Sequence, residues 1–118
     1  FQLNVDGDGG LYTSLYMRSG DLFLGLPFNL FEYALLTHMV GELTSLAPTE
    51  LSVYIANAHV YDNHQEAVAE QLRRPIPPIE ARVKIVPRER SKVEDFNAKD
   101  FSFPDYHPQP RIKAPVAI

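Results

Sequence analysis

The stretch LYTSLYMRSGDLFLGLPFNLFEYALL, residues 11–36, joins the two patterns that decide the fold. Residues 11–19 have a period of two that places Leu11, Thr13 and Leu15 on one face, which is typical of a β-strand. Asn29 and Glu32 have the spacing of a capping box, and apolar side chains then cover most of the helical circumference over residues 30–46. The stretch therefore predicts a strand that leads into a long, largely buried helix.

Further elements are predicted on both sides of this stretch. Residues 1–5 alternate as well, and the turn Asp6-Gly-Asp-Gly-Gly10 between the two alternating segments predicts a hairpin. Pro48 and Thr49 interrupt the chain after the long helix, and residues 51–61, rich in Val, Ile and Tyr, predict a second long strand. A helix over 62–72, a short strand over 82–86, a helical turn capped by Ser91 and Glu94, and an extended end from residue 101 complete the prediction.

Length and composition indicate one domain with a single core. The 118 residues carry a net charge of −4, so no excess positive field attracts DNA. The sequence has no cysteine, which excludes a thiolate metal ligand and a nucleophilic thiol within these residues. No apolar run reaches about 18 residues, so we expect no membrane association and a cytoplasmic location. Because Phe1 already belongs to a strand pattern, we expect a piece of a longer protein.

Arg18, Ser19 and Asp21 stand where the first long strand is predicted to end. A guanidinium and a hydroxyl together suit a phosphate, because Arg offers a planar fork of donors and Ser adds another. The spacing alone favours a simpler interpretation, an ion pair between Arg18 and Asp21 at a surface turn. Helix capping alone likewise explains Asn29 without a ligand.

His59 and Tyr61 form a stronger pair of candidates. They stand two residues apart on a strand, so an imidazole and a phenol could both hydrogen-bond one sugar hydroxyl. A buried pair satisfied by backbone groups explains the spacing equally well. We expect no metal site, because the four histidines lack HExxH-type spacing and cysteine is absent.

Taken together, the motifs resemble the C-terminal part of the thymidylate synthase family, from about residue 11 to the end of the sequence. In the family's order they are Arg18-Ser-Gly-Asp21, Leu24-Gly-Leu-Pro-Phe-Asn29, Tyr33-Ala-Leu-Leu36, Ala58-His-Val-Tyr61 with Asn63-His64, Gln71-Leu-Arg-Arg74, Asp100-Phe101, Tyr106-His-Pro-Gln-Pro-Arg-Ile112 and Ala114-Pro-Val-Ala-Ile118. The resemblance implies an α/β (α+β) fold with a mixed sheet and a long buried helix, in a homodimer whose sheets pack against each other. Residues 1–118 would be the C-terminal part of a single thymidylate synthase-like domain.

The resemblance also implies reductive methylation of dUMP to dTMP, with 5,10-methylenetetrahydrofolate supplying both the carbon and the hydride. By matching position, the phosphate would be held by Arg18 and Ser19, the uracil edge by Asn29, and the ribose 3′-hydroxyl by His59 and Tyr61. Asp21 would lie between the pyrimidine and the pterin. The folate site would be lined by Leu24, Gly25 and Phe28, and it would be closed by the final segment, with Val116 and Ala117.

In the light of this resemblance, Asn29 points to the base that is bound. Uracil offers an N3–H donor beside an O4 acceptor, and a carboxamide presents the complementary acceptor and donor in one plane. Cytosine inverts both groups, and cytosine-specific hydroxymethylases of the same fold resemble this pattern with Asp at the position. Asn29 therefore favours a uracil nucleotide without choosing between methylation and hydroxymethylation.

The sequence also departs from the family pattern. The nucleophilic cysteine, in a Pro-Cys-His motif upstream of the first strand, is absent, as are the N-terminal folate-site residues and the arginines lent across the dimer. These residues alone are therefore expected to hold half a site and no catalytic residue. Asn57 stands where Asp is usual and Ala56 where Gly is usual, which leaves open the network behind His59. Besides a thymidylate synthase, a dUMP hydroxymethylase and a catalytically silent nucleotide-binding fragment are hypotheses.

Overall fold

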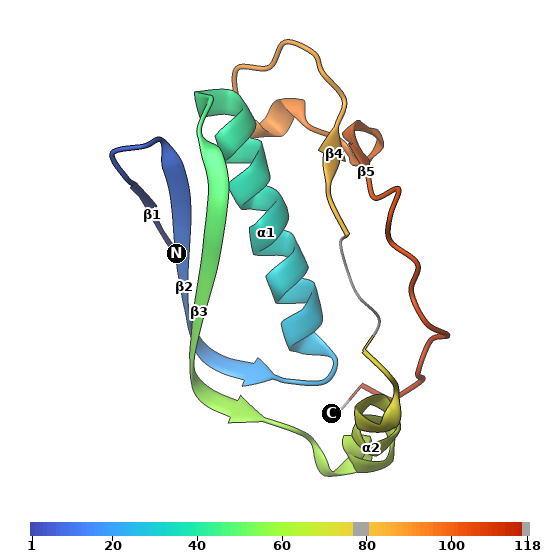
Figure 1. Ribbon diagram of the computed structural model, residues 1–118. Coiled ribbons are helices and arrows are strands. Elements are labelled where there is room, and N and C mark those ends of the chain that lie inside the picture. The colour runs from blue at the N-terminus through green and yellow to red at the C-terminus, as the bar shows by residue number, and fades with distance from the viewer. Residues whose placement is uncertain (77–80, 117–118) are drawn as a thin grey trace.

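The computed structural model describes residues 1–76 and 81–116, in which a three-stranded sheet lies beside one long helix (Figure 1). Strand β1 (Gln2–Val5) runs antiparallel to β2 (Gly10–Asp21), and β2 runs parallel to β3 (Ala47–His59). Helix α1 (Gly25–Thr44) connects the two parallel strands, as a parallel pair requires. The mixed α/β fold with a mixed sheet is therefore confirmed.

The predicted hairpin between β1 and β2 is confirmed, and two residues account for its shape. Asp6 Oδ1 accepts hydrogen bonds from the backbone N–H groups of Asp8 at 3.0 Å and Gly10 at 2.7 Å. Gly9 has a φ of 82°, a conformation that side chains disfavour. The carboxylate and the glycine together set the register in which Leu3 faces Thr13.

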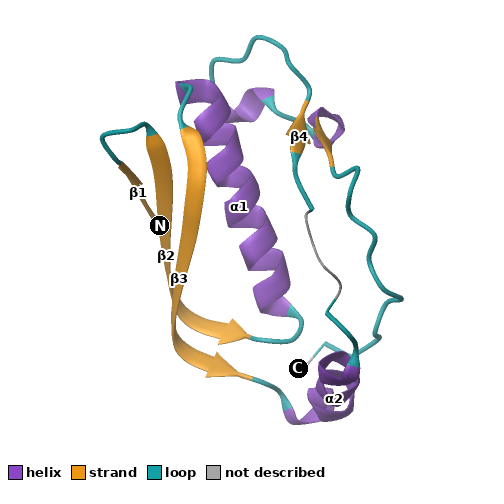
Figure 2. Cartoon of the chain, in the orientation of Figure 1, coloured by secondary structure: helices purple, strands orange, loops and turns teal. Residues whose placement is uncertain are grey.

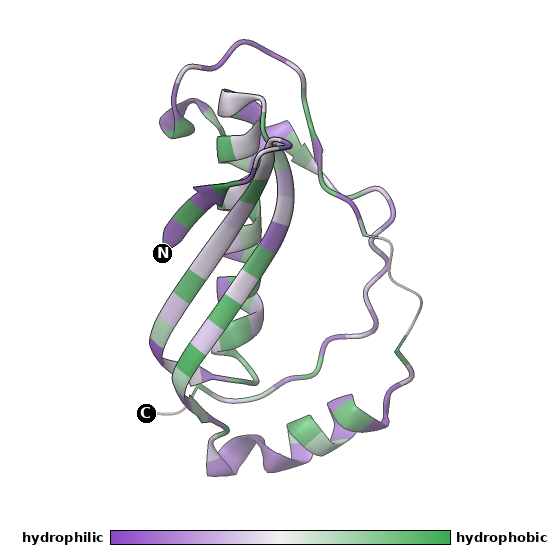
Figure 3. Cartoon of the chain, turned by 60° about the vertical axis from the view of Figure 1, so that its left-hand side comes forward, coloured by the Kyte–Doolittle hydropathy of each residue, from purple (hydrophilic) through white to green (hydrophobic). Residues whose placement is uncertain are grey.

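The contact between α1 and the sheet forms the small core. Leu11 and Leu15 of β2 are buried, and Thr13 between them forms a 2.7 Å hydrogen bond with Thr37 of α1. The face predicted from the period of two is therefore the inner face, and alternating bands of hydropathy follow the two parallel strands in Figure 3. At Gly41 the helix lies so close to β3 that a Cβ atom would be 2.8 Å from the Leu46 carbonyl oxygen.

The prediction of a long, largely buried helix is wrong in its burial. Within α1 only Thr37 and Gly41 are buried, because the sheet covers one face of the helix. Phe28 is 75% exposed, and the radius of gyration, 16.5 Å, exceeds the about 13.5 Å typical of a compact domain of this length. The apolar residues buried in the described ranges are Leu11 and Leu15, so the expected single core is small.

Several element boundaries differ from the prediction. Helix α1 begins at Gly25, five residues early, because Asp21 Oδ1 accepts from the backbone N–H groups of Phe23 at 3.0 Å and Leu24 at 3.3 Å. Strand β3 includes Pro48, which an edge strand tolerates since one side of it needs no donor. Both long strands also end elsewhere than predicted, at Asp21 and His59.

The second half of the chain returns along the far side of α1 (Figure 2). A 3₁₀ turn (Asp62–His64) leads into α2 (Gln65–Arg73), close to the predicted helix. The predicted short strand is β4 (Lys84–Ile85), which pairs with β5 (Phe101–Ser102). The turn predicted to be capped by Ser91 and Glu94 is instead capped by Asp95, whose Oδ2 accepts the Ser91 backbone N–H at 2.9 Å.

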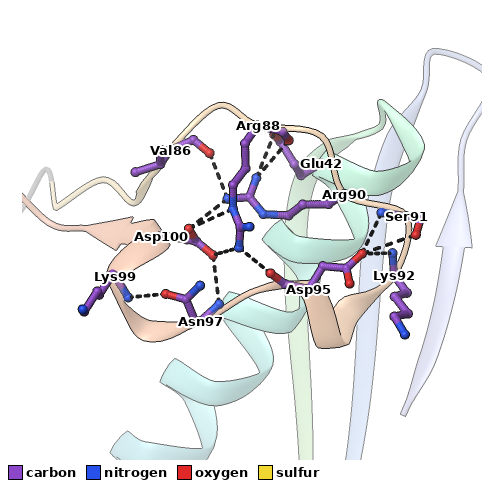
Figure 4. A network of polar contacts seen from close by, with 10 residues as sticks. All are labelled: Glu42, Val86, Arg88, Arg90, Ser91, Lys92, Asp95, Asn97, Lys99 and Asp100. Atoms are coloured by element: carbon purple, nitrogen blue, oxygen red, sulfur yellow. Dashed lines mark hydrogen bonds and ion pairs between the residues drawn. The ribbon is translucent and has the colours of Figure 1, made fainter.

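A polar network holds the segment around β4 and β5 to itself and to α1 (Figure 4). Asp100 accepts from Arg88 Nη2 at 2.7 Å and forms an ion pair with Arg90 Nη2 at 3.2 Å. Mainly through the Arg88 hydrogen bond, this arrangement lowers the pKa of Asp100 to about 2. Arg90 also lies over the Phe96 ring and 4.0 Å from Glu42 of α1. The network anchors a segment that has little regular structure.

Candidate functional site

The carboxyl ends of the parallel strands β2 and β3 bring the first candidate residues together. Asp21 and His59, the last residues of these strands, are register partners, and the Leu22 N–H donates to the His59 carbonyl at 2.8 Å. Open α/β sheets bind ligands outside this edge, where the connecting loops begin. The topology therefore places the Asp21 and His59 side chains at the edge where a ligand is expected.

Asp21 and Asn29 converge at the start of α1. Asp21 Oδ2 and Asn29 Oδ1 each lie 4.0 Å from the point where Gly25 would carry a Cβ atom. Because Gly25 has no side chain, the carboxylate and the carboxamide face a shared space. Asn29 lies inside α1 rather than at its cap, so the capping interpretation of Asn29 is wrong. The Asn29 carboxamide therefore makes no capping hydrogen bond and is available to bind another group.

His59 and Tyr61 lie side by side, as predicted. Their ring centroids are 5.0 Å apart with an interplanar angle of 84°. His59 is half-buried and Tyr61 is 42% exposed, so the alternative of a buried pair is wrong. His59 Nδ1 lies 3.2 Å from the Asn57 carbonyl oxygen, which only accepts, and this contact assigns the proton to Nδ1. The Nε2 lone pair is then free to accept a hydrogen bond from a ligand.

The same contact explains how the chain tolerates its unusual residue at position 57. The partner of His59 is the main-chain carbonyl of Asn57, which every residue type provides. Compared with the Asp that the resemblance implies at this position, Asn57 therefore leaves this support of His59 in place.

Pattern reasoning missed His64, which is completely buried behind Tyr61. Its Nε2 lies 2.7 Å from the Pro115 carbonyl oxygen, and its Nδ1 lies 3.9 Å from Asp21 Oδ1. The rings of Phe23 and Tyr61 pack against the imidazole at centroid distances of 5.4 and 5.7 Å. The signal that could have revealed it was its place in the Asn63-His64 motif, next to the candidates His59 and Tyr61.

The C-terminal segment reaches the site along α2. Arg74 Nη1 donates to the Pro110 carbonyl at 2.6 Å, and Gln109 Nε2 donates to the Pro75 carbonyl at 2.8 Å. The hydrogen bond between His64 and the Pro115 carbonyl is a third contact between these two segments. Segments that are about 50 residues apart in the sequence thus meet beside Asp21.

Arg18 and Ser19 lie within β2, which continues two residues beyond its predicted end, to Asp21. Arg18 is exposed and Ser19 is half-buried opposite Asn57. Consecutive residues of a strand point to opposite faces, so strand position by itself does not bring the two side chains together. In the described part of the chain no ion pair joins Arg18 to Asp21, so the favoured ion-pair interpretation is wrong.

The candidate folate residues are spread over two segments. Leu24 and Gly25 adjoin Asp21 at the start of α1, and the exposed Phe28 follows one turn later. Phe28 also lines an apolar groove of about 610 Å³ between α1 and residues 81–106. Burial lowers the pKa of His38, which lines the same groove. Val116 is 77% exposed, and Ala117 lies outside the described residues.

The described ranges 1–76 and 81–116 hold no group of three or more His, Asp or Glu side chains placed to bind a metal ion. Nor do they contain a helix with the length and apolar character needed to span a membrane.

The chain was also compared with known proteins. The model of the family described as thymidylate synthase matches residues 1–118. A curated relative, thymidylate synthase from Coxiella burnetii (strain Dugway 5J108-111), is 42% identical over 118 residues. That match covers 100% of this chain and 44% of the relative, so the chain spans less than half the length of that protein.

Proposed function

The chain belongs to the thymidylate synthase family, and we propose that it supplies the C-terminal part of an enzyme that converts dUMP to dTMP with 5,10-methylenetetrahydrofolate. The observation that carries this proposal is the meeting of Asp21, Asn29, His59 and Tyr61 at one edge of the sheet. In this proposal residues 1–118 are the C-terminal part of one thymidylate synthase-like domain. The remaining length of the relative corresponds to an N-terminal portion that completes the site.

The donor and acceptor groups at this edge fit a uracil deoxynucleotide. The Asn29 carboxamide offers an acceptor to N3–H and a donor to O4. A ribose 3′-hydroxyl can donate to His59 Nε2, whose lone pair is free, and accept from the Tyr61 hydroxyl. The phosphate is assigned to Arg18 and Ser19 on the resemblance alone.

The folate co-substrate is assigned to the start of α1 and the end of the chain. Leu24, Gly25 and Phe28 line its site in this proposal, and Asp21 lies between the pyrimidine and the pterin. Val116 and Ala117 close over the folate and exclude water from the reacting groups. The residues of this chain thus bind and orient both reactants.

The reaction also needs a group that this chain does not hold. Adding a carbon at uracil C5 requires prior attack at C6 by a strong nucleophile, and the sequence has no thiol. In our proposal the nucleophilic cysteine comes from the N-terminal portion. The 118 residues by themselves are then catalytically silent.

The sheet supports the assignment of a homodimer. Tyr16 and Tyr54 are register partners on neighbouring strands, and they are 71% and 62% exposed. They lie on the sheet face opposite the one that carries Leu15 and contacts α1. Two such faces packed together would bury these rings, as the resemblance implies for the family.

The test is to assay the chain with and without an N-terminal portion that carries the Pro-Cys-His motif. The complete protein should form dTMP and oxidise the folate in equal amounts, whereas the 118 residues alone should form none. Incorporation of formaldehyde carbon without folate oxidation would instead indicate a hydroxymethylase. Binding of dUMP without any product in the complete protein would indicate a silent nucleotide-binding protein and contradict the proposal.

A further inference from the structure

We infer that His64 is a positioning residue that holds the C-terminal segment against the edge of the sheet beside Asp21. In the complete enzyme it would therefore set how this segment lies against the folate site. The inference rests on the proposed function for its effect on folate. The tether itself rests on contacts between described residues.

The environment of His64 leaves its imidazole one orientation. The side chain is 0% exposed, and the rings of Phe23 and Tyr61 flank it. The Pro115 carbonyl oxygen can only accept, so His64 Nε2 carries the proton in their 2.7 Å hydrogen bond. The hydrogen bond is part-buried, and its loss would remove the protein partner of a donor on a buried side chain, so it favours the attached position of the segment.

The other ring nitrogen of His64 lies near the substrate-binding edge without a hydrogen bond to it. His64 Nδ1 is buried without a hydrogen-bond partner, and the polar atom that it faces is Asp21 Oδ1 at 3.9 Å. The same Asp21 oxygen accepts from the Phe23 and Leu24 backbone N–H groups at the start of α1. One buried imidazole thus lies between the C-terminal segment and the residues assigned to the folate.

This arrangement predicts a selective effect on the two reactants. The residues assigned to dUMP lie on β2, α1, the end of β3 and the loop after it, all outside the C-terminal segment. The folate site, in contrast, includes that segment. Loss of the tether should therefore weaken folate binding and leave dUMP binding close to that of the wild type.

The test compares His64→Gln with His64→Asn in the complete protein. The Gln amide nitrogen reaches about as far as Nε2 and can still donate to Pro115, whereas the Asn amide reaches only as far as Nδ1. Trypsin cleavage after Lys113, followed by intact mass, reports release of the segment, and cleavage after Lys92 is the internal control. Cleavage after Lys113 should be about tenfold faster in the Asn variant and near the wild-type rate in the Gln variant.

The kinetic readout separates positioning from a general structural role. The Asn variant should raise KM for the folate about tenfold with the Kd of dUMP changed less than twofold, and the Gln variant should restore KM. If the Asn variant is cleaved after Lys113 at the wild-type rate, or if cleavage after Lys92 and Lys113 accelerates equally, the inference that His64 holds the segment is wrong. Normal tethering in a protein that makes no dTMP would contradict the proposed function and leave the tether standing.

A second measurement avoids substitution of the buried histidine. In the complete protein with labelled histidines, the Nε2–H of His64 should exchange slowly with solvent, as seen by nuclear magnetic resonance. Deleting residues 115–118 should shift this signal and accelerate its exchange. A signal that does not respond to the deletion overturns the inference.

Discussion

Replacing Thr37 by Val should destabilise the protein more than replacing Thr13 by Val, although both changes break the same 2.7 Å hydrogen bond. Thr37 Oγ1 donates its single proton to the Tyr33 carbonyl at 2.7 Å. Thr13 must therefore be the donor in its contact with Thr37. The two positions are both buried, so solvent cannot replace a lost partner.

Which threonine donates in each hydrogen bond determines how much stability each variant loses. In the Thr37→Val variant the Thr13 hydroxyl remains buried without an acceptor, which costs about 1–3 kcal/mol. In the Thr13→Val variant Thr37 still donates to Tyr33, so the cost is the net value of one hydrogen bond, about 0.5–1.5 kcal/mol. The double variant leaves no orphaned hydroxyl and should cost less than the sum of the single changes.

The assay is equilibrium urea unfolding of the complete protein at one fixed protein concentration. The three variants and the wild type should show the same dependence on urea, so that differences in midpoint report stability. An equal or larger loss from Thr13→Val would refute the assigned direction of the hydrogen bond. Strict additivity of the two substitutions would refute the coupling between strand and helix.

Three further substitutions test other parts of the structure. Gly41→Ala should lower stability, because overpacking against the Leu46 carbonyl costs about 1–3 kcal/mol and outweighs the about 1 kcal/mol that Ala adds in a helix; Gly7→Ala, which meets nothing within 4 Å, should change the urea midpoint little. Asp100→Asn should flatten the pH dependence of stability in acid unfolding. The pKa of Asp100 falls from its ordinary 3.8 to about 2, so its stabilisation is present above pH 4 and lost between pH 4 and 2; an unchanged acid profile would contradict this. Asn29→Asp in the complete enzyme should shift the ratio of kcat/KM from dUMP toward dCMP by about tenfold to a hundredfold, since a donor at the base edge becomes an acceptor; an unchanged ratio would exclude Asn29 from base recognition.

Features that depend on neighbouring residues could be predicted from the sequence. The period of two identified the inner face of β2, and the glycine-rich turn identified the hairpin. Two-residue spacing placed His59 beside Tyr61. The order of the motifs also identified the family. Each of these follows from a short stretch whose geometry is set by backbone sterics and side-chain periodicity.

Features that depend on distant contacts were decided by the tertiary structure. Parallel pairing of β2 with β3 set Asp21 beside His59, and Asp21, rather than Asn29, determined where α1 begins. Burial of α1 depends on what covers its other faces, which hydropathy along the helix does not report. The contact of His64 with Pro115 spans 51 residues, and no local pattern encodes it. A local pattern restricts the torsions of neighbouring residues, whereas these contacts form only when the whole chain has packed.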